Sequence, residues 1–281
     1  MKSLVKLLVN GMARFVCGFF KWGIVGNYFW DCLLENIRSQ YKIVSFRGFE
    51  FKFSTPNHLA LYRAETFSTK EPETLEWIDK MSSGSVVWDI GANVGLYSIY
   101  AAKTKGCRVF AFEPSIFNLE LLSRNIDLNC LTEKVTIVPL PLSEQLSFNT
   151  LRMTSKTWGG ALSTFGEDFG HDGEEIKKVF EFPTIGLSMV DAVKLLNIPQ
   201  PDYIKMDVDG IEHLILKGGM PILQAARGVL VEINDDFTVQ AQQTEKLMLK
   251  AGFKFKEKRH ADYFDEVDDA ASHTYNQFWI K

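Results

Sequence analysis

The sequence contains few cysteines, and it has no long block of one charge. The four cysteines in 281 residues are Cys17, Cys32, Cys107 and Cys130. They lack the C-x-x-C spacing and the neighbouring histidines of a zinc site, and they are too scattered for a disulfide framework. We therefore expect a reducing, cytoplasmic setting. The formal net charge is −4, and without a block of lysine and arginine we expect no nucleic-acid partner.

Uninterrupted apolar runs are also missing. Near the N-terminus, Lys2, Lys6, Arg14 and Lys21 interrupt an apolar segment too often for a membrane span of about 20 residues, and no clear cleavage site marks a secretory signal. The apolar residues recur at helical spacing and predict an amphipathic helix or helix pair. Such helices either dock on the rest of the chain or on a partner subunit, as in a homo-oligomer, or they lie on a membrane surface. The apolar positions are Leu4, Leu7, Leu8, Met12, Phe15, Val16, Phe19, Phe20 and Trp22.

Strand and helix patterns alternate through most of the chain. Alternation of this kind predicts a mostly parallel sheet with helices on both faces. The length fits one large α/β domain at 69–281, preceded by a helical extension and hairpin at 1–68. The expected strands are 86–90, 108–112, 135–140, 202–206, 228–233, 253–257 and 276–281, and the expected helices are 94–104, 115–129, 188–197, 211–217 and 238–251.

Two stretches depart from this alternation. Apolar residues alternate at 41–54 and predict a small β-hairpin that turns at Arg47-Gly48, and Pro72 fits the first turn of a following helix. Between 143 and 183 the pattern is irregular, with glycines and acidic residues. Loops of this length are usually functional or mobile, so the segment is either a substrate lid or a plain surface excursion.

The most informative segment is Val86–Gly95, an apolar strand that ends in Asp89 and passes into a glycine-containing turn. Glycine lets such a turn bring backbone close to a ligand. The turn lacks the G-x-G-x-x-G fingerprint of dinucleotide-binding proteins, and its acid suits a cationic cofactor better than a pyrophosphate. Roughly 20 residues further on, the next strand ends in Glu113, where a carboxylate can accept hydrogen bonds from both ribose hydroxyls. The two elements predict a half-site for an adenosine-containing cofactor.

Three motifs carry a family resemblance. They are Asp89–Ser98 (DIGANVGLYS), Phe112–Asn118 (FEPSIFN) and Tyr203–Glu212 (YIKMDVDGIE). In this order they resemble the motifs of the FkbM-like family of S-adenosylmethionine-dependent methyltransferases, and the likeness runs from about Thr69 to the end of the chain. The resemblance implies a Rossmann-like class I methyltransferase fold, with a seven-stranded sheet whose last two strands form an antiparallel pair at one edge. It also implies S-adenosylmethionine as cofactor and a sugar hydroxyl as acceptor, in a surface polysaccharide or another glycosylated metabolite.

Several polar residues near these motifs are candidates for cofactor contacts. The amide of Asn93 can hold the cofactor carboxylate, and Tyr97 either contacts the cofactor or packs. Asn118 either braces the ribose-binding turn, as the resemblance favours, or caps the next helix, and Leu142 and Ser143 are placed to border adenine. The predicted cofactor-binding residues are Asp89, Gly91, Asn93, Gly95, Tyr97, Glu113, Asn118 and Ser143.

The candidate catalytic residues follow strand 202–206. Methyl transfer needs positioning, and an alcohol acceptor must also lose a proton. Asp207 and Asp209 are expected to alternate along one strand face, and His213 follows them with a pKa suited to a general base. His213 is equally well read as a helix-surface histidine. The family usually has glutamate where this chain has Asp209, which keeps the charge but shortens its reach.

A magnesium site is an alternative use of these oxygens. Asp207 with Asn234 or Asp235 offers hard ligands to Mg²⁺. Without histidine or cysteine companions a metal is not favoured, and Glu232–Asn234 can instead close the floor of the pocket.

The strand ends supply the main argument for a site. In parallel sheets ligands gather at the carboxyl ends of the strands, and Asp89, Glu113, Ser143, Asp207 and Asn234 all fall there. The leading hypothesis is an O-methyltransferase that acts on a small molecule or glycan. One alternative is an NAD-dependent oxidoreductase on a similar sheet, against which the missing fingerprint counts. The other is a non-catalytic cofactor-binding scaffold whose N-terminal helix recruits a partner.

Overall fold

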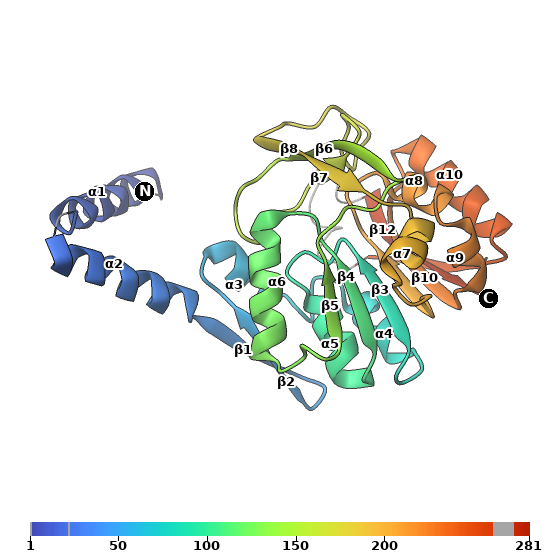
Figure 1. The fold of residues 1–281 in the computed structure, drawn as a ribbon, viewed down its shortest axis with the longest axis horizontal. Helices are drawn as coiled ribbons and strands as arrows, with labels where there is room; N and C mark the ends of the chain where they lie inside the picture. The colour runs from blue at the N-terminus through green and yellow to red at the C-terminus, as the bar shows by residue number, and fades with distance from the viewer. Residues whose placement is uncertain (1, 22, 261–272) are drawn as a thin grey trace.

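The computed structural model describes residues 2–21, 23–260 and 273–281, and its centre is a seven-stranded sheet. The strands are β3 (Val86–Ile90), β4 (Arg108–Phe112), β5 (Val135–Val138), β9 (Tyr203–Met206), β10 (Gly228–Asn234), β11 (Lys254–Arg259) and β12 (Thr274–Ile280). Their order is β11-β12-β10-β9-β3-β4-β5, and all neighbours from β10 to β5 are parallel (Figure 1). β12 is antiparallel to both β10 and β11. The predicted sheet, with its antiparallel edge, is confirmed.

Helices cover both faces of the sheet because successive residues of a strand point to opposite sides. In β3, Trp88 and Ile90 belong to one apolar core and Val87 belongs to the other. The six-residue α9 is a helix that the sequence analysis did not identify. The helices of the first core are α7 (Met189–Leu196), α8 (Glu212–Lys217), α9 (Met220–Ala225) and α10 (Thr238–Lys250), and those of the second are α4 (Pro72–Asp79), α5 (Leu96–Lys105) and α6 (Ile116–Leu128).

The predicted hairpin is present as β1 (Tyr41–Phe46) and β2 (Phe49–Ser54), and it packs on the main domain. Phe51 is fully buried, with its ring 5.6 Å from that of Tyr100 on α5. The backbone N–H of Ser54 donates to Asn125 Oδ1 of α6 at 2.7 Å. A short helix that the sequence pattern did not reveal, α3 (His58–Glu65), follows the hairpin.

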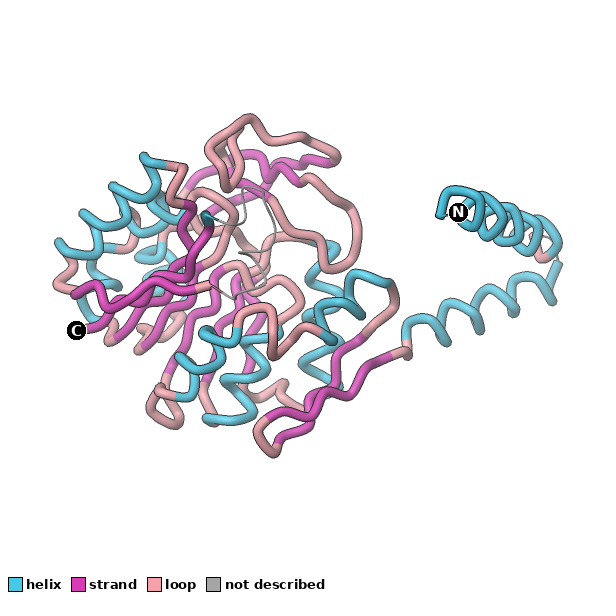
Figure 2. Tube along the Cα trace, turned by 180° about the vertical axis from the view of Figure 1, so that it is seen from behind, coloured by secondary structure: helices cyan, strands magenta, loops and turns pink. Residues whose placement is uncertain are grey.

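The predicted N-terminal helix pair is also present, as α1 (Lys2–Phe19) and α2 (Gly23–Arg38). Trp22, one of the apolar positions of the sequence pattern, lies outside the described residues. The two helices extend away from the rest of the molecule in both views (Figures 1 and 2). Of the helices within the described ranges, none is long and apolar enough to cross a membrane.

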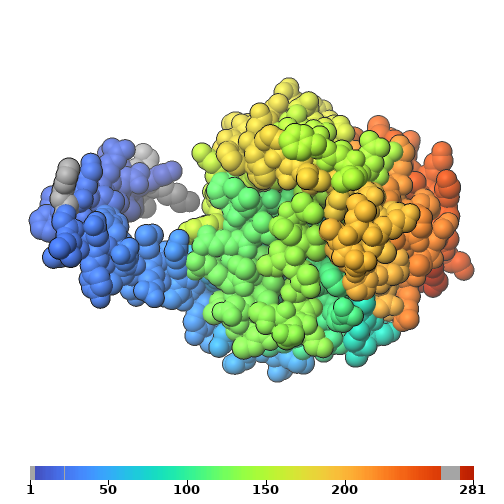
Figure 3. All heavy atoms as spheres, in the orientation of Figure 1, coloured from blue at the N-terminus to red at the C-terminus, as the bar shows by residue number. Residues whose placement is uncertain are grey.

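The expectation of an irregular stretch between residues 143 and 183 was wrong, because this part of the chain contributes to a second sheet. Its strands are β6 (Ser147–Met153), β7 (Ser163–Phe165) and β8 (Phe180–Gly186), in the order β7-β6-β8 and all antiparallel. The glycines and acidic residues that obscured the pattern lie mainly in the connection between β7 and β8. This small sheet forms a layer across the top of the domain (Figure 3).

Candidate active site

A cavity of about 540 Å³ lies at the carboxyl ends of β3, β4, β9 and β10. The turn after β3 and the end of β4 form one part, and the residues that follow β9 form another. The small sheet contributes Leu151, Ser163 and Phe165 to the wall. Seven predicted site residues line the cavity, namely Gly91, Asn93, Tyr97, Glu113, Asn118, Asp207 and Asp209.

The turn after β3 needs glycine for two reasons. Gly91 has a φ of 79°, and a Cβ there would collide with the carbonyl oxygen of Asp207. Gly95 has a φ of 82°, and a Cβ there would collide with Leu122 of α6. Gly91 therefore lets the turn lie against the β9 loop, whereas Gly95 lets α5 approach α6.

Asp89 supports this turn from behind and is not among the residues that line the cavity. Its Oδ2 accepts a 2.6 Å hydrogen bond from Ser98 Oγ, at the start of α5. Its buried Oδ1 has no hydrogen-bond partner among the described residues. Burial raises the pKa of Asp89, although the nearby Lys205 ammonium opposes the shift. Asp89 thus links the end of β3 to the helix that follows it.

Glu113 holds the rim of the cavity at the end of β4. Its Oε2 accepts the backbone N–H of Asn93 at 2.7 Å, and its Oε1 accepts that of Ser115 at 2.8 Å. Burial raises the pKa of Glu113 to about 7, although these hydrogen bonds lower it. The Glu113 side chain therefore joins the turn after β3 to the turn after β4.

Asn93 and Asn118 connect these turns to the loop between β6 and β7. Each side-chain amide donates to the carbonyl of Gly160, at 2.8 Å and 3.0 Å, and Asn118 Oδ1 accepts the N–H of Gly159 at 3.0 Å. Asn93 Oδ1 is buried and has no hydrogen-bond partner within the described ranges. The small sheet is therefore tied to the rim of the cavity.

Apolar residues close the side of the cavity beyond β5. Leu140, Pro141 and Leu142 line it, together with Phe112. Ser143 is not among the lining residues, and its N–H donates to the carbonyl of Leu187 at 2.8 Å. Its neighbour Leu142 is the residue that faces the cavity.

Three acidic residues and two lysines meet at the other end of the cavity. The carboxylates of Glu71, Asp207 and Glu232 have oxygen atoms within 4.8 Å of one another, and we call them the carboxylate cluster. Lys205 Nζ lies 2.9 Å from Asp207 Oδ2, and Lys70 Nζ lies 3.0 Å from Glu71 Oε1. Lys205 is only 3% exposed. No sequence pattern pointed to Lys70, Glu71 or Lys205 as residues of the site.

The charges of the carboxylate cluster are distributed unequally. Burial disfavours ionisation of Asp207, but the ammonium groups of Lys205 and Lys70 outweigh it and lower the pKa of Asp207 to about 2. Burial, followed by the charge of Asp207, raises the pKa of Glu232 well above its usual range. Glu232 hydrogen-bonds to Asp207, so Asp207 is the member of this pair that ionises more readily. Tyr97 hydrogen-bonds to Glu71 and keeps its proton, because burial raises the pKa of Tyr97.

Asp207 and Asp209 do not alternate along a strand face, as the sequence analysis expected, because β9 ends at Met206. Asp209 has a φ of 63° and accepts the N–H groups of Leu162 and Ser163 at 2.8 Å and 3.2 Å. It therefore anchors β7 over the cavity.

His213, Asn234 and Asp235 lie outside the cavity. His213 is buried on α8 with its ring 5.9 Å from that of Phe237, it is not among the lining residues, and burial lowers its pKa. Asn234 Oδ1 accepts the N–H of Asp236 at 3.0 Å, and Asp235 pairs with Lys258. Neither Asn234 nor Asp235 is among the residues that line the cavity with Asp207.

The family profile described as Methyltransferase FkbM domain matches residues 89–255, more than half of the chain. The chain belongs to the FkbM methyltransferase family. The matched residues of this FkbM methyltransferase include Asp89, Glu113, Asp207 and Glu232, and they exclude Lys70, Glu71 and the arm formed by α1 and α2.

Two named relatives are methyltransferases. The chain is 24% identical over 225 residues to the hexuronic acid methyltransferase AglP of Haloferax volcanii, covering 79% of this chain and 85% of AglP. It is 26% identical over 200 residues to the methyltransferase sdnD of Sordaria araneosa, covering 63% of this chain and 76% of sdnD.

Solved structures of methyltransferases share the fold. An FkbM methyltransferase from Methylobacillus flagellatus superposes with a TM-score of 0.51 at 14% identity, over 81% of this chain and 54% of that one. A putative SAM-dependent methyltransferase from Streptococcus mutans also gives 0.51, at 11% identity, over 86% and 55%. The chain thus spans about half the length of these two structures. The likeness confirms the class I, Rossmann-like fold.

Proposed function

We propose that this methyltransferase uses S-adenosylmethionine to methylate a hydroxyl group of a sugar, in a surface polysaccharide or another glycosylated metabolite. The observation that carries the proposal is one cavity that joins the Glu113 turn to the carboxylate cluster. Such a cavity has room for a nucleoside cofactor and a polar acceptor side by side. The name of AglP, a hexuronic acid methyltransferase, supports a sugar acceptor.

The turn after β3 and the end of β4 fit S-adenosylmethionine. Glu113 would accept the ribose hydroxyls, and the unpartnered Asn93 Oδ1 offers a further acceptor at the same rim. Gly91 keeps the turn open to the methionine part, while Leu140 and Leu142 would border the adenine in place of the Ser143 side chain. Asp89 and Gly95 would act through the shape of the turn. When bound, S-adenosylmethionine supplies a methyl group activated by a sulfonium.

The carboxylate cluster would receive the acceptor hydroxyl. Asp207 remains ionised because Lys205 holds it, so it can accept a hydrogen bond and then the proton of the hydroxyl. A weak base is sufficient, since the hydroxyl proton becomes strongly acidic as its oxygen forms a third bond, to the methyl carbon, and the bond from that carbon to sulfur breaks. We propose Asp209 as a positioning residue through β7, and we assign no chemical step to His213.

We propose that Mg²⁺ is not required. The hard oxygen ligands of the carboxylate cluster suit such an ion, but the ammonium groups of Lys70 and Lys205 already pair with Glu71 and Asp207, at 3.0 Å and 2.9 Å. Methyl transfer should therefore proceed equally in EDTA and in excess Mg²⁺. A rate that depends on the added ion would overturn this part of the proposal.

The direct test is transfer to a panel of glycosides and nucleotide-linked sugars. We expect mass spectrometry to detect methylated product and S-adenosylhomocysteine in equal amounts from at least one sugar. Cofactor binding without turnover on the whole panel would favour the scaffold, and binding of NAD⁺ in preference to S-adenosylhomocysteine would favour the oxidoreductase. We infer a cytoplasmic setting for this activity, supported by the four free cysteines.

A further inference from the structure

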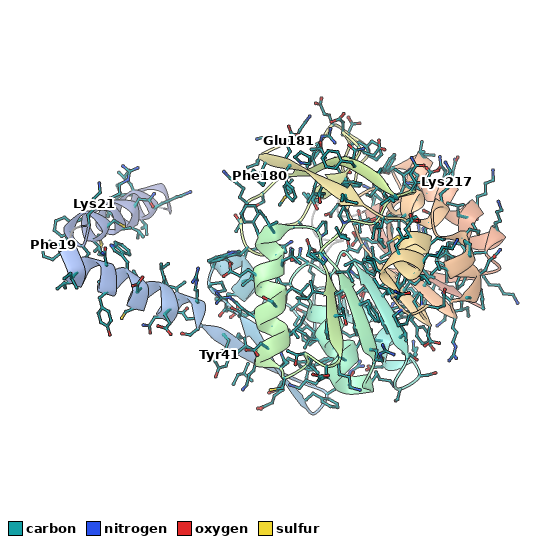
Figure 4. All side chains as sticks on the ribbon, in the orientation of Figure 1. Phe19, Lys21, Tyr41, Phe180, Glu181 and Lys217 are labelled. Atoms are coloured by element: carbon teal, nitrogen blue, oxygen red, sulfur yellow. The ribbon has the colours of Figure 1, made fainter. Side chains whose placement is uncertain are left out.

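The arm formed by α1 and α2 is joined to the domain at its base. Arg124 of α6 donates to the carbonyl of Arg38, the last residue of α2, at 2.6 Å. From there the two helices lead away from the domain, and the labelled Phe19 and Lys21 lie at the far bend (Figure 4). The arm therefore presents its own surface to the surroundings.

One face of α1 is an exposed apolar stripe. Leu4, Leu8, Met12, Phe15 and Phe19 fall on the same side of the helix, because residues three or four positions apart are neighbours there. Their side chains are between 61% and 74% exposed. An exposed apolar patch of this kind usually marks an interaction site, so we expect the stripe to contact an apolar environment outside the domain.

The other helix of the arm leaves this stripe uncovered. Phe29 of α2 stacks on Phe20 with ring centroids 3.9 Å apart, and Trp30 donates to the Phe20 carbonyl at 3.0 Å. Trp30 lines a groove with Arg14 and Lys21, away from the apolar stripe. α2 therefore packs against the end and the polar side of α1.

The charge of the N-terminal residues indicates what kind of surface covers the apolar stripe. Residues 1–21 contain four basic residues and no acidic residue, so they carry +4, whereas the rest of the chain carries −8 of the total of −4. Lys6 and Arg14 lie on the side of α1 opposite the apolar stripe, and Lys21 follows its end. Pairing two arms would bring like charges together. A surface with anionic groups above an apolar layer matches both faces of α1, because the anionic groups attract the basic side and the apolar layer accepts the apolar stripe.

We propose that the arm lies in the interface of an anionic lipid bilayer, with the apolar stripe of α1 among the acyl chains and its basic residues at the level of the phosphates. Interfacial helices have this combination of a strong apolar face, a basic polar face and aromatic side chains. Arg63 of α3, which follows the hairpin that continues from α2, lines the cavity. An arm on the bilayer would hold the cavity near the membrane, within reach of a lipid-linked acceptor, a consequence that rests on the proposed function.

The test is sedimentation of the full chain with vesicles of phosphatidylcholine and phosphatidylglycerol, mixed about two to one, in the absence of cofactor and acceptor. The result is therefore independent of the proposed methyl transfer. We expect binding at low salt, loss of most binding at high salt, and little binding to pure phosphatidylcholine. No binding, or equal binding to both kinds of vesicle, would overturn the proposal.

Variants separate the two faces of the arm. Replacing Lys6, Arg14 and Lys21 by glutamine should weaken partitioning about 100-fold, at about fivefold for each basic residue. The matched control replaces Lys246, Lys250 and Lys254, which are exposed on α10 and at the start of β11, and should leave partitioning unchanged. Equal losses in both triple variants would contradict the assignment to the arm.

The apolar face is tested in the same assay. Phe15→Glu should abolish binding, whereas Leu249→Glu, at an exposed leucine of α10, should not. Unaltered thermal unfolding verifies that each variant is folded. Sedimentation velocity without lipid tests the other occupant: a dimer that Phe15→Glu dissociates would show that a second copy covers the stripe, and would overturn the proposal.

Discussion

The ion pair between the buried Lys205 and Asp207, whose side chain is 24% exposed, gives the sharpest prediction on stability. Lys205→Met keeps most of the side-chain volume but removes an ammonium group that is 3% exposed and 2.9 Å from Asp207 Oδ2. Removing one partner of a buried ion pair typically costs about 3–5 kcal/mol, because the other charge is left uncompensated. In a domain of this size we expect the Tm to fall by roughly 6–20 °C.

The matched control is Lys217→Met. Lys217 lies at the same 2.9 Å from Glu144, but the two side chains are 56% and 41% exposed, and Lys217 projects from the surface (Figure 4). Surface pairs contribute about 0–1 kcal/mol. Urea unfolding of both variants therefore compares two ion pairs that have the same nitrogen–oxygen distance but differ in their exposure to solvent. Equal losses of unfolding free energy in the two variants would refute the reasoning.

The loss in Lys205→Met should also depend on pH. In the wild-type chain the pKa of Asp207 is lowered to about 2 in the folded state. Its ionised form therefore stabilises the fold above pH ~4, and this contribution is lost as the pH falls through 2. Without Lys205 the folded-state pKa of Asp207 rises, so the difference between wild type and variant should be largest near neutral pH and shrink towards pH ~4. A difference that grows on acidification would contradict this account.

Three further predictions concern the cavity. Gly91→Ala should destabilise the fold by about 2 kcal/mol more than Gly84→Ala in urea unfolding. Both glycines have positive φ, but only a Cβ at Gly91 would collide with backbone. Equal losses of unfolding free energy in the two variants would show that the close approach of Gly91 to Asp207 does not require glycine. Asp207→Asn should lower kcat by about 10²–10⁴ in methyl-transfer assays while the Kd for S-adenosylhomocysteine stays within a few-fold, and an unchanged kcat would exclude Asp207 from the mechanism. Because burial raises the pKa of Glu113 to about 7, the affinity for S-adenosylhomocysteine measured by calorimetry should fall about tenfold per pH unit below pH 7. Glu113→Gln should bind S-adenosylhomocysteine weakly, with an affinity that does not change with pH. An equally steep pH dependence in Glu113→Gln would show that another group titrates.

The central sheet and one half of the site could be predicted from the sequence. Asp89 and Glu113 lie at the carboxyl ends of two strands. Because the carboxyl ends of parallel strands share one edge of the sheet, the positions of these two acids could be predicted. The glycines between them indicate close backbone approach, which Gly91 shows against Asp207. Local patterns are sufficient for these features, since each depends on a few consecutive residues.

The other half of the site depends on tertiary contacts that no local pattern encodes. Lys70 and Glu71 precede α4 and are far in sequence from Asp207, yet their side chains meet in one cavity. Glu232 offered a signal, as an acid within the apolar run of β10. His213 had suitable chemistry, but the register of α8 turns its ring towards Phe237.

The small sheet was missed for a related reason. β6 pairs with β8 across a long connection, from Ser147 opposite Gly186 to Met153 opposite Phe180. Non-local antiparallel pairing of this kind leaves no turn signal between adjacent strands. The hairpin at 41–54 was found because its two strands are joined by Arg47 and Gly48 alone.

Calorimetric titration with S-adenosylhomocysteine, in parallel with NAD⁺ and with the Glu113→Ala variant, tests the central claim most directly. The account predicts micromolar binding of S-adenosylhomocysteine, no comparable binding of NAD⁺, and loss of the S-adenosylhomocysteine signal in a folded Glu113→Ala variant. Absence of binding to the wild-type chain, or binding that Glu113→Ala retains in full, would contradict the assignment of the Glu113 turn to the cofactor.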